Sequence, residues 1–304
     1  MIPRPDEHDE NDHQEGSDPR AHERLFWRRL AHWGASRGPE WWVRYSPPVF
    51  GWAAAALVPK ARRAVRRNLR EIRGPASLRD DARDVLATFA TYASCLAEVL
   101  SNDADGGPRA PNAVIHGGAF VRETMAIQRG IVIVTAHTAG WETVGPLLGR
   151  DYGLPMMLVM ANERDGKAQS LQDGARKRSG LEITHVGSDP LASLPLLRHL
   201  RAGGVVALQL DRAVAGMRTR SVELLGRAGE VPEGPLRLAQ LSGAPILPVF
   251  CARTGYRQYV IQAFAPRKLE RRADDADLDQ AAQYLATCMT TFLRAYPTQW
   301  FKFA

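Results

Sequence analysis

The feature that most constrains the fold of this chain is an alternation of short apolar runs with amphipathic stretches between residues 131 and 294. The apolar runs are rich in β-branched residues and predict strands, and helical patterns separate most of them. Nearly continuous apolar runs are typical of parallel strands buried on both faces. The sequence therefore predicts an α/β fold with a mostly parallel central sheet and helices on both faces. The predicted strands are 131–136, 156–160, 183–186, 205–210, 246–250 and 259–264, and the predicted helices are 164–178, 189–202, 234–242 and 277–294.

The distribution of charge divides the chain into a short tail and a basic body. Residues 1–20 contain seven acids and two arginines, so they carry −5 and the remainder carries +12, which together give the formal net charge of +7. Such a polar segment cannot bury a core, so residues 1–21 are predicted to be a disordered acidic tail. Residues 22–304 show no internal repeat and no linker, which predicts a single domain. The basic body favours anionic partners: membrane lipid, nucleic acid or an acidic carrier protein.

Cysteine usage and the first residues of the chain favour a reducing compartment. The three cysteines lie far apart without a CxxC pair, which favours free thiols over a disulfide framework. The acidic N-terminal residues do not resemble a signal peptide, and no apolar stretch reaches the roughly 20 residues that a spanning helix needs. Histidines and cysteines lack metal-ligand spacing, and the GxGxxG and GxxxxGK[ST] motifs do not occur. The sequence thus predicts neither a metal centre nor a nucleotide-binding loop of these kinds.

Residues 22–75 combine an aromatic stretch with a strongly cationic helix. Trp and Tyr favour the boundary of a membrane, and the apolar run at 52–58 is too short to span one. Pro47 and Pro48 are expected to interrupt the helical pattern before that run. Each cation near an anionic leaflet contributes about 1 kcal/mol, so we predict a membrane-contacting helical segment, although a helix pair packed on the body fits the same pattern. The cations of this helix are Lys60, Arg62, Arg63, Arg66, Arg67, Arg70 and Arg73.

The central apolar run ends at His137, and Glu142 follows five residues later. In a continuous helix, residues five apart lie about 140° from each other, on different faces. If the strand ends at His137 and a turn at Gly140 leads into a helix near Trp141, the carboxylate can fold back toward the imidazole. A carboxylate that accepts from one ring nitrogen leaves the other nitrogen to take a proton, which predicts a general base. Alternatively, a backbone carbonyl satisfies His137, and Glu142 is an ordinary acid in a first helical turn.

Charged residues also follow a later strand. Asp211 and Arg212 come directly after residues 205–210, at the carboxyl edge where ligands of open α/β sheets bind. Glu223 lies in an apolar setting within SVELLG. Plainer interpretations remain open: an ion pair that ends a strand for the first two residues, and an exposed residue on an edge strand for Glu223.

Five segments, taken in order, resemble one enzyme family. The segment AHTAGWE resembles the H-x4-D/E motif of the lysophospholipid acyltransferase superfamily. The other four are similar to the branch that contains the lipid A late acyltransferases and the phosphatidylinositol mannoside acyltransferases. They are GGVVALQLDRAVAG, SVELLG, PEGPLRLAQLSGAPILPVF and YPTQWFKF. The resemblance covers roughly residues 25–304.

This resemblance implies that His137 is the general base and Glu142 its orienting carboxylate. The sequence departs from the common family pattern at two places. Ala139-Gly140 replaces Gly-Asn, and Pro146 lies early in the helix expected to follow. The base and the carboxylate are intact, so the departures bear on the acceptor and on the geometry of the turn.

The resemblance also implies roles for residues outside that motif. Arg176, with Arg178 as the alternative, falls about where the family keeps a basic residue near the acyl or acceptor site. Asp211 and Arg212 match an Asp-Arg or Asp-Gln pair, and Glu223 lies where the mannoside enzymes have a glutamate. The expected oxyanion donor is Arg176 or the backbone N–H groups after Gly140.

The implied activity is O-acyl transfer from an acyl carrier protein or CoA thioester to a hydroxyl of a membrane glycolipid, such as a lipid A precursor. No metal or redox cofactor is expected. The expected location is the cytoplasmic face of the inner membrane, with peripheral or interfacial anchoring. A glycerophospholipid acyltransferase of the same superfamily and a non-catalytic membrane-surface binding protein are the alternatives. Nucleic-acid binding, which only the charge suggests, ranks last.

Overall fold

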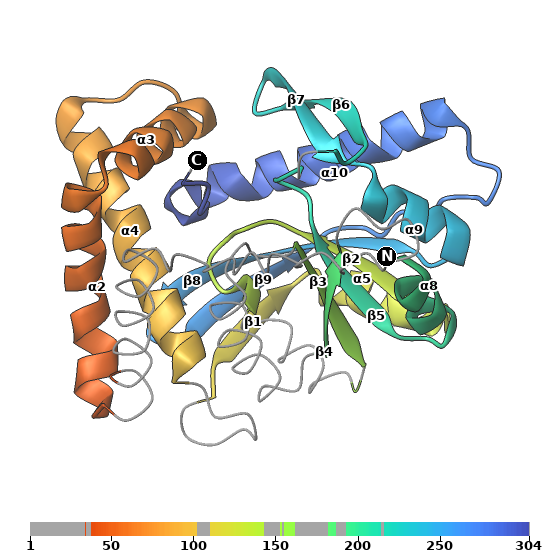
Figure 1. Ribbon diagram of the computed structural model, residues 1–304, viewed down its shortest axis with the longest axis horizontal. Helices are drawn as coiled ribbons and strands as arrows, with labels where there is room; N and C mark the ends of the chain where they lie inside the picture. Colours follow the sequence, from red (N-terminus) through yellow and green to blue (C-terminus); the bar gives the residue numbers. More distant parts are fainter. Residues whose placement is uncertain are drawn as a thin grey trace, which may run out of the picture.

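The computed structural model describes residues 34, 38–101, 110–142, 153, 155–161, 182–186, 193–213 and 216–303 (Figure 1). Several sequence-based expectations lie outside these ranges. They are the acidic tail at 1–21, the helix at 164–178, Pro146, Arg176 and Arg178.

The central sheet is formed by β1 (Asn112–His116), β2 (Ile131–Thr135), β3 (Met156–Ala161), β4 (Glu182–Val186), β5 (Val205–Gln209), β8 (Ile246–Gly255) and β9 (Gln258–Ala263). Among the described residues the strand order is β1-β9-β8-β2-β5-β3-β4. Neighbouring strands from β8 to β4 are parallel, β9 is antiparallel to β8, and β1 is parallel to β9. The predicted, mostly parallel sheet is therefore confirmed.

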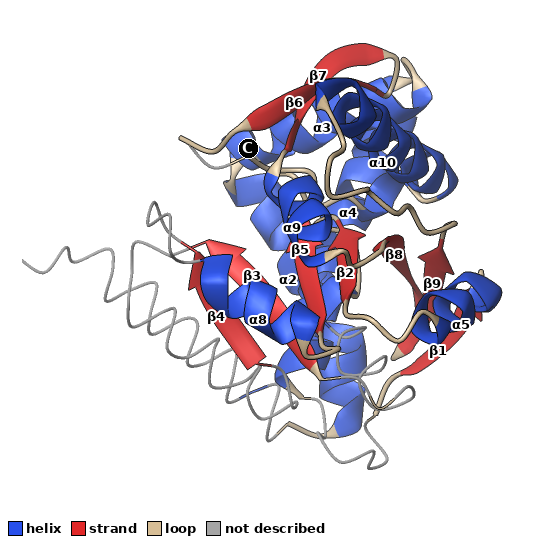
Figure 2. Cartoon of the chain, turned by 90° about the vertical axis from the view of Figure 1, so that its right-hand side faces the viewer, coloured by secondary structure: helices blue, strands red, loops and turns tan. Residues whose placement is uncertain are grey.

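Helices cover both faces of this sheet, as predicted. Side chains alternate across a strand, so Ile131 and Ile133 of β2 point to one face and Val132 and Val134 to the other. Among the residues that the structure describes, helices pack on both faces. They are α5 (Gly118–Ala126) on the first, and α8 (Leu194–Arg201), α9 (Gly234–Ser242) and α10 (Asp275–Ala295) on the second. All of β2 is buried, and it lies between β8 and β5 within the sheet (Figure 2).

An antiparallel hairpin, which the sequence did not predict, is formed by β6 (Thr219–Leu224) and β7 (Arg227–Pro232) and packs on α10 (Figure 1). Its two-residue loop has positive φ at Leu225 (57°) and at Gly226 (79°), the geometry that matches the twist of paired strands. The nearly buried Arg220 fixes the hairpin through carboxylates of α10 at 2.6 and 3.0 Å.

Three of the described helices stand beside the sheet (Figure 1): α2 (Glu40–Leu57), α3 (Pro59–Arg73) and α4 (Leu78–Leu100). The expected interruption at Pro47 and Pro48 is wrong, because α2 continues through both prolines. Packing offsets their missing hydrogen bonds. Gly51 lies so close to α4 that a Cβ would collide with the backbone of Phe89.

The cationic face of α3 is partly neutralised by α4. Arg66, Arg70 and Arg73 donate to the buried Asp81 at 2.8, 2.7 and 2.8 Å. Hydrogen bonds from Arg66 and Arg73 hold the pKa of the Asp81 carboxyl well below its usual range. These arginines therefore join α3 to α4, and only part of the predicted cationic cluster is left for other partners.

Within the described ranges, none of the helices combines the length and the apolar character that crossing a membrane requires.

Candidate active site

His137 and Asp211 meet just beyond the ends of β2 and β5. These strands are parallel neighbours with Thr135 opposite Gln209, so the second residue after each strand reaches the same edge of the sheet. Oδ1 of Asp211 accepts from the backbone N–H of His137 at 3.1 Å and lies 2.9 Å from its ring Nδ1. The His137 side chain is 21% exposed, whereas that of Asp211 is fully buried. An accessible imidazole is thus held by a buried carboxylate.

The second carboxylate oxygen of Asp211 accepts a hydrogen bond from Trp300. Its indole N–H donates to Oδ2 at 2.9 Å. Burial alone would raise the pKa of the Asp211 carboxyl, but the hydrogen bonds and charge of His137, together with Trp300, lower that pKa below its usual value. An ionised carboxylate only accepts hydrogen bonds, so Nδ1 of His137 carries a proton. Nε2 is then the nitrogen that can take a proton from a substrate.

The turn after His137 depends on Gly140, as the sequence predicts. Gly140 has φ +82°, which favours glycine, and a Cβ at this position would overlap the ring of Tyr259. The backbone N–H of Trp141 donates to Thr138 O at 3.4 Å, and helical structure begins at Trp141. The Trp141 ring then stands edge-on to the imidazole, with ring centroids 5.9 Å apart.

The segment Gln299–Phe303, which we name the C-terminal strap, lies across this turn. The backbone N–H of Phe301 donates to His137 O at 2.7 Å, and that of Ala139 donates to Gln299 O at 3.1 Å. These bonds form a short antiparallel bridge. The backbone on both sides of the imidazole is therefore fixed by residues more than a hundred positions further along the chain.

A buried ion pair holds the tyrosine that packs against this turn. Glu98 of α4 accepts from Nε and Nη2 of Arg253 at 2.9 and 2.7 Å and from the hydroxyl of Tyr259. The bond to Glu98 fixes the tyrosine ring that lies against Gly140. Three elements, α4, β8 and β9, thus set the conformation of one glycine.

A thiol also packs beside the turn. Cys95 belongs to the same buried cluster as Ala139, and burial raises the pKa of the Cys95 thiol to about 12. It therefore stays protonated at neutral pH, which makes it a poor nucleophile. Among the residues that the structure describes, no group of three or more His, Cys, Asp or Glu side chains is arranged to hold a metal ion.

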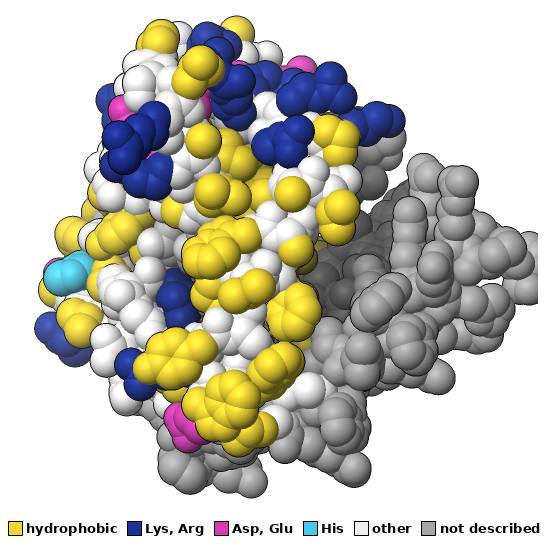
Figure 3. Space-filling view, turned by 90° about the vertical axis from the view of Figure 1, so that its left-hand side faces the viewer, with side chains coloured by type: hydrophobic (Ala, Val, Ile, Leu, Met, Phe, Trp, Pro, Cys, Tyr) yellow, Lys and Arg dark blue, Asp and Glu magenta, His cyan; other side chains and the backbone are white. Residues whose placement is uncertain are grey.

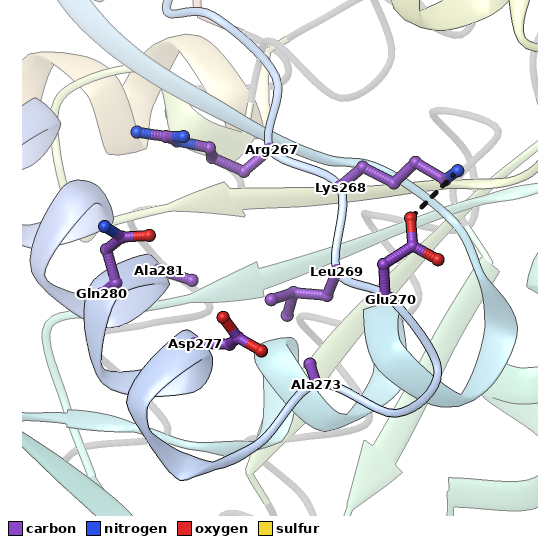
Figure 4. Close-up of a pocket in the computed structure, with 8 residues that line it drawn as sticks. All are labelled: Arg267, Lys268, Leu269, Glu270, Ala273, Asp277, Gln280 and Ala281. Carbon is purple, nitrogen blue, oxygen red and sulfur yellow. Dashed lines mark ion pairs between the residues drawn. The ribbon is translucent and has the colours of Figure 1, made fainter.

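A small cavity of about 140 Å³ lies elsewhere, between the segment after β9 and the first turns of α10 (Figure 4). Lys268 and Glu270 form an ion pair at 3.4 Å on its rim. None of its lining residues belongs to the cluster around His137.

Comparison with known proteins identifies the family. The model of the bacterial lipid A biosynthesis acyltransferases matches residues 23–304. The chain belongs to this acyltransferase family. A phosphatidylinositol mannoside acyltransferase of Mycolicibacterium smegmatis is 26% identical over 247 residues, which are 78% of this chain and 76% of that protein. The crystal structure of the 1-acyl-sn-glycerophosphate (LPA) acyltransferase PlsC from Thermotoga maritima covers 90% of this chain and 99% of its own, with 12% identity and a TM-score of 0.40.

In this acyltransferase, the carboxylate at Nδ1 of His137 is that of Asp211 and not that of Glu142. The reason is the strand order, which brings the end of β5 beside the end of β2. Glu142 lies half-buried in the first helical residues after Gly140. Spacing within the H-x4-E segment is visible in the sequence, whereas the neighbouring strand is not.

The other predicted site residues are distributed differently. Arg212 is bonded to the C-terminal strap, because its Nη2 donates to Phe301 O at 2.8 Å. Glu223 has an exposed side chain on β6, and its backbone exchanges hydrogen bonds of 2.8 and 3.0 Å with Gln283 of α10. The backbone of Glu223 is therefore bonded to α10. Arg176 and Arg178 lie outside the described residues.

Sequence analysis predicted no role for Trp300, Gln299, Tyr259 or Glu98. YPTQWFKF was recognisable as a family segment, but nothing in it indicates that its tryptophan reaches Asp211. Glu98 and Tyr259 lie within a helical and a strand pattern that predict only packing.

Proposed function

We propose that this acyltransferase moves a fatty acyl group from a thioester to a hydroxyl of a membrane glycolipid, with His137 as the general base. Membership of the family supports acyl transfer on lipids. The observation that carries the assignment of the base is the 2.9 Å contact between Nδ1 of His137 and the buried Asp211. In this proposal the orienting role passes from Glu142 to Asp211.

The reaction follows from the proton positions. Nε2 of His137 takes the proton of the acceptor hydroxyl as its oxygen attacks the thioester carbonyl. Asp211 stabilises the imidazolium that forms. When the tetrahedral intermediate collapses, the carbon–sulfur bond breaks and the thiolate takes the proton from Nε2. The products are the acylated lipid and the free thiol, and His137 returns to its starting state. The oxyanion would be stabilised by Arg176 or by backbone N–H groups after Gly140.

Different observations support the acyl donor and the acceptor lipid. Acyl carrier protein and CoA both carry negative charge and fit a body with a formal charge of +12 outside the first 20 residues. A glycolipid acceptor is supported by the name of the mycobacterial relative, a phosphatidylinositol mannoside acyltransferase. The chemistry at His137 is the same for either donor.

Transfer from each donor is the test of this function. The protein would be incubated with a ¹⁴C-labelled acyl-CoA or acyl carrier protein thioester and with one acceptor at a time: a lipid A precursor, a mannosylated phosphatidylinositol or lysophosphatidic acid. We expect label to enter a glycolipid from one of the donors, with one thiol released per acyl group. Intact thioester with every acceptor would refute the catalytic proposal. Transfer to lysophosphatidic acid alone would replace the acceptor class.

We also propose that the protein docks on an anionic membrane through α2 and the start of α3. Figure 3 shows many hydrophobic side chains spread over this side of the molecule, with most of the Lys and Arg side chains at one end. Burial of large aromatic side chains at the membrane boundary is favourable. The exposed apolar residues are Trp41 (63%), Trp42 (38%), Tyr45 (63%), Val49 (57%), Phe50 (59%), Trp52 (49%), Leu57 (80%) and Val58 (45%).

Cations adjoin this apolar face. Lys60, Arg63 and Arg67 of α3 are exposed, and none of them is among the arginines that bind Asp81. Attraction of about 1 kcal/mol for each such cation would complement aromatic insertion. Docking here corresponds to peripheral attachment at the cytoplasmic face of the inner membrane.

Vesicle binding tests the docking surface. In sedimentation with phosphatidylglycerol vesicles, the double substitution Trp41→Ser and Trp52→Ser is expected to weaken partitioning at least about tenfold, because two large apolar side chains no longer insert. The control pair is Leu194→Ser and Leu241→Ser, two similarly exposed side chains on α8 and α9. Equal binding by both double variants would contradict the assignment of this surface.

A further inference from the structure

We propose that Trp300 is a positioning residue of the active site: its indole N–H fixes the carboxylate of Asp211, which in turn fixes the imidazole of His137. The kinetic part of this inference rests on the acyl-transfer function proposed above. Trp300 itself need not touch a substrate.

The two oxygens of Asp211 have separate donors. Oδ1 receives the backbone N–H of His137 and lies against the ring Nδ1, at 3.1 and 2.9 Å, whereas Oδ2 receives the indole of Trp300 at 2.9 Å. The terminal torsion of an aspartate is broad, so bonds to one oxygen alone leave the carboxylate free to rotate. The third bond, from the opposite side, removes that freedom and holds Oδ1 in line with Nδ1.

The indole is itself fixed on several sides. Trp300 is 3% exposed and belongs to the core cluster between the sheet and α10. The Lys302 ammonium lies 5.2 Å from the centroid of its ring. Further along the strap, the amide of the buried Asn68 on α3 donates to Lys302 O at 2.6 Å. A buried indole has one donor and no acceptor, so Asp211 is its required partner.

The strap connects this donor to the helices beside the sheet. The ring of Phe303 packs against that of Phe89 on α4, with ring centroids 5.1 Å apart. The ring of Tyr92, also on α4, lies against those of Phe301 and Phe303, with centroid distances of 5.2 and 5.0 Å. The backbone of the same segment pairs with Thr138 next to the imidazole. The strap therefore sets the distance between the Trp300 indole and the end of β5.

Trp300 could instead be only a large core residue. In that case Trp300→Phe would lower stability, and its effect on turnover would not depend on Asp211. A positioning role predicts dependence on Asp211, because residues that act as one unit are strongly non-additive. The two roles therefore differ in a double-mutant cycle.

The experiment measures kcat, KM and thermal unfolding for Trp300→Phe, Asp211→Ala and the double variant in the full chain. We expect Trp300→Phe to lower kcat at least about tenfold with KM within about twofold, and to cause no further loss when Asp211→Ala is already present. Replacement of Trp300 by 3-benzothienylalanine, which keeps the shape and lacks the N–H, is expected to give the same loss if Trp300→Phe folds poorly. An unchanged kcat, or an equal loss in both backgrounds, would overturn the inference.

A second measurement does not require turnover. In ¹⁵N-histidine spectra, the ring signals of His137, assigned by their disappearance in His137→Gln, are expected to shift in the benzothienylalanine protein and to stay in place in the control Trp52→Phe. Unshifted His137 signals would refute the positioning role even in a protein without acyl transfer. Shifted signals in a protein that transfers no acyl group would support the positioning role and reject the proposed function alone.

Discussion

A protein that carries His137→Gln is expected to lose acyl transfer by about a thousandfold or more while it keeps its fold. Glutamine has a side-chain N–H group that can still donate to Asp211, but it has no nitrogen that takes a proton at neutral pH. The backbone bonds of residue 137 to Asp211 and Phe301 do not involve the imidazole. Initial rates with a saturating labelled thioester measure the loss, and thermal unfolding checks the fold.

The matched control for this change is His116→Gln, which replaces an exposed histidine on β1. Its kcat is expected to stay within about twofold of the unmodified protein, because surface substitutions away from a site change little. A His137→Gln protein with near-normal turnover would show that another group removes the proton.

Asp211→Asn is expected to lower kcat by about 10³- to 10⁴-fold, the size of effect that follows when the orienting carboxylate of a catalytic histidine becomes an amide. The amide can present an N–H to Nδ1, which drives the ring proton to Nε2 and removes the lone pair that the reaction needs. It also removes the charge that stabilises the imidazolium. KM is expected to change little, because Asp211 is buried behind the imidazole.

The comparison that decides between the two carboxylates is Glu142→Gln. We expect a smaller loss of kcat there than in Asp211→Asn, since Nδ1 of His137 is already bonded to Asp211. A larger loss in Glu142→Gln would return the orienting role to the carboxylate that the sequence indicated. Thermal unfolding of both variants shows whether a loss of kcat comes from a loss of folded protein. A variant that unfolds at the normal temperature but has a low kcat is impaired in proton transfer.

The strands and the helices around them could be predicted because each carries its own local signal. β2 is an apolar, β-branched run, and α9 and α10 begin and end near the positions that their periodicity indicates. His137 could be found for a similar reason: it is the polar residue that ends the apolar run of β2. In contrast, the antiparallel bridge between the C-terminal strap and the turn after His137 joins residues too distant in sequence for any local pattern to connect them.

Where the sequence-based prediction was incomplete, tertiary pairing decided the outcome. The contact of Asp211 with His137 depends on β5 lying next to β2, which no spacing within one segment reveals. The short edge strand β1 exposes Val114, and the β6–β7 hairpin is largely solvent-facing, so neither shows a clear apolar alternation. Pro47 and Pro48 signal an interruption that close packing of α2 on α4 overrides.

The C-terminal strap has a consequence for translation. While a nascent chain grows, His137 and Asp211 emerge well before Trp300, which is 89 positions beyond Asp211. Until the ribosome has released the strap, the imidazole lacks its backbone bridge and the carboxylate lacks its second donor. If His137, Asp211 and Trp300 act as proposed, the growing polypeptide would not transfer acyl groups until the strap has left the ribosome and reached its place beside His137.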